Sequence, residues 1–178
     1  MAAVKIARFR RVETDSLDDI AAMLEGRVFH VSKLAYLDAI LRDGEIRTNV
    51  DGSLPTSFGF LSNGFFRKRD CVSLFDYRLA LTDEIRGYRG KCSPLMPARP
   101  ASEGVAILLM LPEIHTSLIP WSTWKDENAC GDMIVPYVEV GHRGPIPLRM
   151  VEEIICLSLD EDPTSLAAIL RRNRHTAG

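Results

Sequence analysis

The segment 105–111, VAILLML, constrains the fold more than any other part of the sequence. This apolar run is too short to cross a bilayer, which takes about 20 residues in a helix. It also lacks the alternation of apolar and polar residues that marks a strand with one face in water. We therefore expect 105–111 to be a central strand covered on both faces. A chain of 178 residues is long enough to build such a core as one domain spanning 1–178.

Local patterns predict short strands and helices around this segment. Strands are expected at 27–31, 71–75, 133–140 and 154–159, where apolar and β-branched residues gather. Helices are expected at 17–25, from a cap at Ser32 to just before Gly44, and at 76–86, 148–153 and 163–173. The segments 45–70, 91–104 and 120–132 are expected to be irregular connections. The sequence thus predicts an α+β fold.

The composition excludes several classes of protein. Apolar content of 46% and charged content of 26% are ordinary for a soluble globular chain, and a net charge of −2 gives no overall basic field for nucleic acid. The four cysteines show no Cys-x-x-Cys spacing and no His-Glu-x-x-His motif occurs, so we expect no metal site. The N-terminal residues lack the apolar core of a signal peptide. We expect a cytoplasmic protein without a membrane segment.

The first candidate motif is FHVSKLAYLDAILRDGEI, at 29–46. His30 lies near the end of a predicted strand, and Ser32 stands where the next helix is expected to begin. One interpretation is a capped helix beside a histidine whose hydrogen bonds are satisfied within the fold. The other makes His30 and Ser32 polar contacts for a ligand.

The second motif is SFGFLSNGFFRKRDCVSLFDYR, at 57–78. It places aromatic and basic residues before a predicted buried strand. Arginine suits phosphate groups, and aromatic rings suit flat ligands. A solvated basic loop over apolar filler explains the same pattern. The candidates are Phe66, Arg69, Tyr77 and Arg78, with Phe65 and Arg67 as alternatives.

The third motif is a carboxylate inside an apolar stretch. Glu139 belongs to MIVPYVEV, at 133–140. In an alternating strand it shares one side with Met133, Val135 and Tyr137. That side faces either water or a cleft, and alternation alone does not distinguish the two.

Together and in this order, the three motifs resemble the ADP-ribosyltransferase family, and within it the DarT-type DNA-targeting toxins. Phe29 to Ser32, with a helix closed by Gly44, is similar to the family's early strand and helix. The segment RDCVSLFDYR is similar to its mid-chain strand. Glu139 with Pro147, in EVGHRGPIP, has the spacing of its late strand, and the resemblance spans 28–158. It implies an ADP-ribosyltransferase-like α+β fold, with two small packed antiparallel or mixed sheets and flanking helices around an NAD cleft.

The resemblance also implies an activity. The expected reaction is NAD-dependent transfer of ADP-ribose, without a metal, to a nucleic acid or protein acceptor. A toxin or defence role would make an antitoxin a candidate partner. The implied catalytic residues are Glu139 and Arg78, and the implied NAD-binding residues are His30, Ser32, Phe66, Arg69 and Tyr77. No Gly-x-Gly-x-x-Gly occurs, so a Rossmann site is not expected.

Three alternatives stay open at this point. The first is an NAD-dependent RNA 2'-phosphotransferase, a related branch of the same fold. The second is a non-enzymatic module that binds nucleic acid or protein. In the third, Glu139 simply faces water on an exposed side of the sheet.

Overall fold

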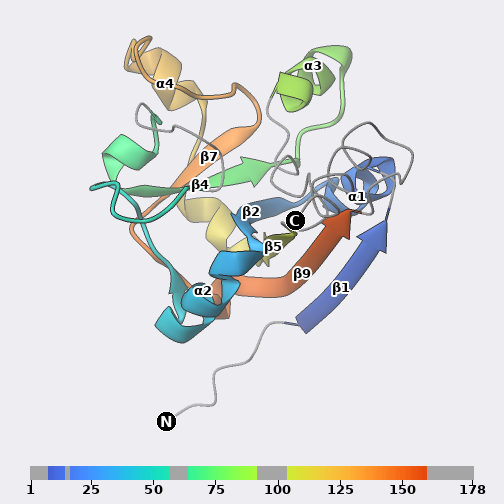
Figure 1. Cartoon of the computed structure of the whole chain (residues 1–178). Helices are drawn as coiled ribbons and strands as arrows, with labels where there is room; N and C mark the ends of the chain where they lie inside the picture. The colour runs from blue at the N-terminus through green and yellow to red at the C-terminus, as the bar shows by residue number, and fades with distance from the viewer. Residues whose placement is uncertain (1–7, 15–16, 57–63, 92–103, 160–178) are drawn as a thin grey trace, which may run out of the picture.

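The computed structural model describes residues 8–14, 17–56, 64–91 and 104–159, which form a curved mixed sheet flanked by helices (Figure 1). The seven strands follow the order β1-β9-β5-β2-β4-β7-β6. A second, two-stranded sheet pairs β3 (Glu45–Ile46) with β8 (Ile146–Pro147). The large sheet consists of β1 (Arg8–Thr14), β2 (Val28–Lys33), β4 (Cys71–Asp76), β5 (Val105–Met110), β6 (Leu118–Ile119), β7 (Glu139–Arg143) and β9 (Val151–Leu159). The predicted α+β class is confirmed.

Strand β5 is the centre of the hydrophobic core, as its sequence predicts. It pairs antiparallel with β9 on one side and β2 on the other, and its whole length is buried. Val105, Ile107 and Leu109 contribute to the cluster on one face of the sheet, while Leu108 and Met110 contribute to the cluster on the other. A strand between two apolar layers has no face left for polar side chains, which explains the continuous apolar run.

Helices cover both faces of the sheet (Figure 1). Helix α1 (Leu17–Leu24) places Ile20 and Leu24 in the first core cluster. Helix α2 (Leu37–Asp43) places Leu37 in the second and ends at Gly44, whose φ of 72° closes the helix in the left-handed conformation. Helices α3 (Asp83–Lys91) and α4 (Ser122–Asp126) lie at the top of the view in Figure 1, above β4 and β7.

The large sheet is divided between β2 and β4. These strands pair only at Val28 with Asp76 and Phe29 with Phe75. By contrast, β2 pairs with β5 from Phe29 to Lys33, and β4 pairs with β7 along most of its length. Beyond Phe29 the two strands separate, leaving β1-β9-β5-β2 on one side and β4-β7-β6 on the other. The sequence predicted two small packed sheets, whereas the structure joins both halves as one sheet through this short junction.

Several predicted elements are wrong in extent or type. Strand β2 continues to Lys33, so Ser32 lies within the strand and does not cap a helix. Residues 76–82 are not helical, because the helix begins after Thr82, whose Oγ1 accepts a hydrogen bond from the Ile85 amide at 3.2 Å. Residues 148–150 form one 3-10 turn and strand β9 follows at once. Strand β1 was not predicted, and the predicted helix 163–173 lies outside the described residues.

Candidate functional site

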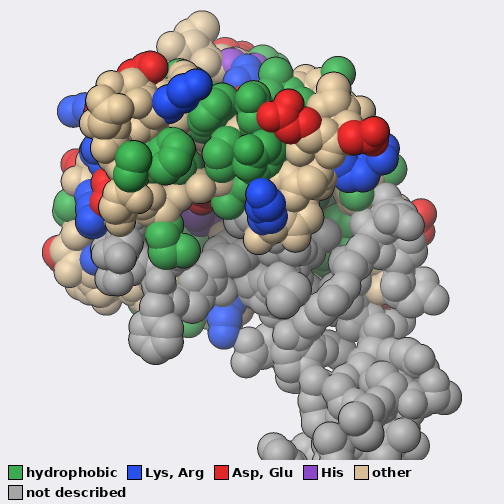
Figure 2. Space-filling model, turned by 90° about the horizontal axis from the view of Figure 1, so that it is seen from above, with side chains coloured by type: hydrophobic (Ala, Val, Ile, Leu, Met, Phe, Trp, Pro, Cys, Tyr) green, Lys and Arg blue, Asp and Glu red, His purple; other side chains and the backbone are tan. Residues whose placement is uncertain are grey.

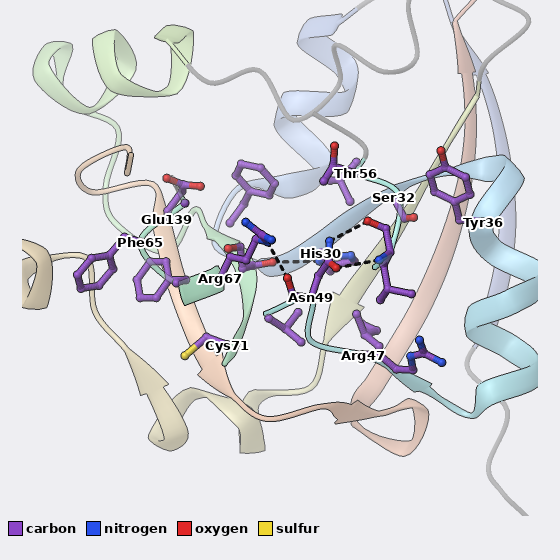
Figure 3. A pocket seen from close by; sticks show the side chains of 18 of the residues that line it. His30, Ser32, Tyr36, Arg47, Asn49, Thr56, Phe65, Arg67, Cys71 and Glu139 are labelled. Atoms are coloured by element: carbon purple, nitrogen blue, oxygen red, sulfur yellow. Dashed lines mark hydrogen bonds between the residues drawn. The ribbon is translucent and has the colours of Figure 1, made fainter. Parts of the chain in front are cut away.

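A cavity of about 560 Å³ lies where β2 and β4 separate (Figure 3). Its walls come from both halves of the sheet, from α2 and from the segments around 45–56 and 64–67. The volume falls in the range of small-molecule sites, which is about 300–1,000 Å³. Of the residues predicted from sequence, His30, Ser32, Phe66 and Glu139 line it, together with the alternatives Phe65 and Arg67. The division of the sheet therefore creates a site that side chains distant in sequence share.

His30 spans the gap between the two halves of the sheet. Its Nδ1 lies 3.0 Å from the carbonyl oxygen of Ser73 on β4, just beyond the last paired residues. A carbonyl oxygen only accepts, so Nδ1 carries the proton and donates. Burial lowers the pKa of His30, and the bond to Ser73 opposes this effect only in part. The imidazole is therefore neutral at pH 7, with Nε2 as a hydrogen-bond acceptor.

Glu139 lies at the first position of β7, after a tight turn rather than inside a strand. The Glu139 amide bonds to Val135 O at 3.0 Å, and Tyr137 between them has a φ of 62°. The predicted strand 133–140 is wrong because this turn interrupts it. The Glu139 carboxylate accepts a hydrogen bond from the Val135 amide at 2.6 Å. Burial raises the pKa of Glu139, while that hydrogen bond lowers it by a smaller amount.

Ser32 and Phe66 line the same cavity from deeply buried positions. Ser32 is 4% exposed and pairs through its backbone with Ala106 on β5. Phe66 is 2% exposed and packs so closely on Gly141 of β7 that a Cβ there would lie 2.2 Å from the ring. Little of the Phe66 ring is left for a ligand to stack on. Tyr36, which sequence reasoning missed, is a half-buried aromatic residue of the cavity wall.

Among the described residues of the cavity wall, Arg67 is the half-buried cation (Figure 3). Its Nε donates a 2.6 Å hydrogen bond to the carbonyl oxygen of Asn49. The other described cations of the wall, Arg47 and Lys91, are exposed. Sequence reasoning offered Arg67 only as an alternative to its neighbours and missed Asn49. The pattern FFRKR includes the segment that lines the cavity. Its basic side chains point in different directions because Arg67–Arg69 forms one turn of 3-10 helix.

Arg69, Tyr77 and Arg78 do not line this cavity. Arg69 lies 3.6 Å above the Phe65 ring and forms ion pairs with Glu127 and Asp132. Arg78 binds the carboxylate of Asp76 through Nε and Nη2, at 2.8 and 2.6 Å. Tyr77 is buried in the core, packed against Phe29. These three predicted site residues take structural contacts.

Aromatic side chains gather beside the turn that carries Glu139. The Tyr137 ring lies 4.5 Å from the Trp121 ring and 5.3 Å from the Tyr88 ring of α3, centre to centre. Figure 2 looks down on the side of the molecule where Figure 1 shows α3 and α4. Hydrophobic side chains gather on this side. Trp124, the second tryptophan of this segment, instead packs inward and donates from Nε1 to Asp132 O at 3.0 Å. Of the two tryptophans in this segment, Trp121 therefore joins this aromatic group and Trp124 does not.

Within the described residues, no three side chains of His, Cys, Asp or Glu converge as metal ligands. The same part of the chain has no helix with the length and apolar character needed to span a membrane. Compared with known proteins, the chain matches no family model, no curated protein and no solved structure.

Proposed function

We propose that this protein is an NAD-dependent ADP-ribosyltransferase whose site is the cavity between β2 and β4. The observation that carries the proposal is that His30 and Glu139, from opposite halves of the divided sheet, line one cavity. The ADP-ribosyltransferase-like fold is part of the same proposal. Its support is the division of the sheet at the point where a family member would hold NAD between two sheets.

The cavity offers chemically suited partners for a ribose and for the diphosphate of NAD. Nε2 of neutral His30 accepts a hydrogen bond from a ribose hydroxyl, which a protonated imidazole cannot do. Arg67 pairs with the diphosphate, because a guanidinium fork matches anionic oxygens. Tyr36 offers a half-buried ring for apolar contact. In this proposal Arg67 and Tyr36 take the roles that the sequence assigned to Arg69, Arg78 and Tyr77.

Glu139 is the proposed catalytic carboxylate. The bond between the ribose C1' and the nicotinamide nitrogen breaks, and its electron pair leaves with nicotinamide. The ribose becomes an oxocarbenium ion, which a fixed negative charge stabilises. The acceptor then forms a bond to C1' and gives its proton to Glu139. Burial raises the pKa of this carboxylate, which makes it a stronger base.

The acceptor is a nucleic acid or a protein that approaches beside Glu139. The rings of Tyr137, Trp121 and Tyr88 lie on that side and suit planar groups. Nicotinamide release, followed by chromatography, tests the activity with added single-stranded DNA, RNA, 2'-phosphorylated RNA or cell lysate. We expect one polymer addition to stimulate release and to acquire ADP-ribose. Loss of phosphate from the 2'-phosphorylated RNA would instead indicate the phosphotransferase. No release under any condition would reject both enzymes.

A further inference from the structure

Hydrogen bonds close the loop 49–54, whose two ends line the cavity. The Asn49 side chain crosses the loop and makes two hydrogen bonds of 2.9 Å to Leu54, from Nδ2 to the carbonyl oxygen and from the Leu54 amide to Oδ1. The Gly52 amide bonds to Asn49 O at 3.2 Å. Both polar groups of the Asn49 side chain therefore form hydrogen bonds that hold the loop in its conformation.

The Arg67 side chain contacts this loop. Its Nε bonds to Asn49 O at 2.6 Å, the same oxygen that accepts from the Gly52 amide. Gly52 has a φ of 73°, and a Cβ there would lie 2.5 Å from Arg67 Nη2. Glycine at 52 therefore satisfies two requirements, a left-handed backbone and room for the guanidinium.

We propose that Asn49 and Gly52 are positioning residues that aim Arg67 at an anionic diphosphate in the cavity. A guanidinium has five N–H donors, so one group can hold Asn49 O through Nε and also bind anionic oxygens. A bond to a fixed carbonyl reduces the rotamer freedom of a long side chain, which otherwise opposes binding. The proposal rests on the proposed function for the identity of the diphosphate, but it concerns different residues.

A double-mutant cycle tests this, with inorganic pyrophosphate and NAD as separate probes in isothermal titration calorimetry. Gly52→Ala is expected to weaken binding of both probes by about tenfold or more in the wild-type background, as expected for a misplaced charge-assisted hydrogen bond. In the Arg67→Ala background it should change binding less than about twofold, because the group it displaces is absent. Asn49→Ala should follow the same pattern.

Gly26→Ala is the matched control. Gly26 has nearly the same φ, 74°, but its Cβ would meet nothing within 4 Å, and the residue is absent from the cavity wall. This control separates backbone strain from displacement of Arg67. It should leave the affinity for pyrophosphate unchanged, and urea unfolding should show that all variants are folded.

The outcomes separate the two proposals. Pyrophosphate binding that Gly52→Ala weakens only when Arg67 is present, without NAD binding, would reject the proposed function and retain the positioning role. NAD binding that Gly52→Ala leaves unchanged, or weakens equally with and without Arg67, would reject the positioning role alone. Binding of neither probe by the wild type would reject both.

Discussion

His30 Nδ1 lies 3.0 Å from Ser73 O, and this hydrogen bond spans the two halves of the sheet where their backbones no longer pair. Had the ladder of β2 and β4 continued, backbone groups would occupy this space and no cavity could form. The bond thus links the halves, fixes the tautomer of His30 and leaves Nε2 as the acceptor at the site.

The stability of the protein should depend on His30 below neutral pH. Burial lowers the pKa of His30 in the folded state, so the unfolded chain binds the proton more tightly. The stability that His30 contributes is then present above its ordinary pKa of 6.5 and is lost as the pH falls below that value. When urea unfolding is measured from pH 7.5 to 5, the free energy of unfolding should fall less for His30→Gln than for the wild type. Ser32→Ala, a cavity variant without a titrating group, should keep the wild-type slope.

Glu139 should act on stability in the opposite sense. Its folded-state pKa is raised above the ordinary value of 4.5, so the folded chain binds the proton more tightly. The stability that Glu139 contributes is then fully present below pH 4.5 and is lost as the pH rises through the raised pKa of the folded state. Glu139→Gln keeps an oxygen for the Val135 amide and removes the buried charge. Its unfolding free energy, relative to wild type, should increase with pH over this window. A constant difference would contradict the burial of the charge.

Three arginines that lie close in sequence should give different phenotypes. Arg67→Ala should weaken NAD binding roughly 10- to 100-fold, since a hydrogen bond to a charged group contributes about 1.5–3 kcal/mol. Arg78→Ala should leave NAD affinity nearly unchanged, because Arg78 is paired with Asp76. Arg69→Ala should do the same, since Arg69 binds Glu127 and Asp132. Calorimetry of the three variants checks this. A weaker effect at Arg67 than at Arg78 would restore the assignment made from sequence.

Gly141 should be intolerant of any side chain. A Cβ at this position would lie 2.2 Å from Phe66, whose ring is enclosed in the core. Gly141→Ala should destabilise the protein by about 1–3 kcal/mol, the usual cost of overpacking. Gly87→Ala is the control, because a Cβ on this helical glycine would meet nothing within 4 Å. Equal urea midpoints for the two variants would contradict the close packing of Phe66.

The parts of the fold that local patterns determine could be predicted from sequence. The apolar run 105–111, the helix α1, the end of α2 at Gly44 and the strand at 71–75 follow from residue periodicity and helix-ending signals. The edge strand β1 was missed because it is largely exposed and its sequence does not mark a buried face. The turn before Glu139 was missed because the positive φ of Tyr137 depends on tertiary contacts with its neighbours.

Part of the cavity lining could be predicted from sequence. His30, Ser32 and Glu139 stand out as polar residues within apolar segments, and Phe66 belongs to an aromatic and basic segment. Arg67 could not be separated from Arg69 and Arg78, because their directions depend on one 3-10 turn and on acidic partners far away in sequence. Asn49 could not be identified from sequence, because an asparagine in a polar loop is common. Its role depends on its side-chain bond to Leu54 and on the bond from Arg67 to its carbonyl oxygen, which only the structure gives.

The central claim is that NAD is cleaved in this cavity with Glu139 as its carboxylate. The most direct test measures NAD affinity and the rate of nicotinamide release for the wild type and Glu139→Gln, with the stimulating acceptor present. We predict similar affinities and a rate at least about 100-fold lower for the variant, the usual loss when a group that stabilises transition-state charge is removed. Glu152→Gln, on β9 away from the cavity, should keep the wild-type rate. Release by Glu139→Gln at the wild-type rate, or no binding of NAD by the wild type, would contradict the claim.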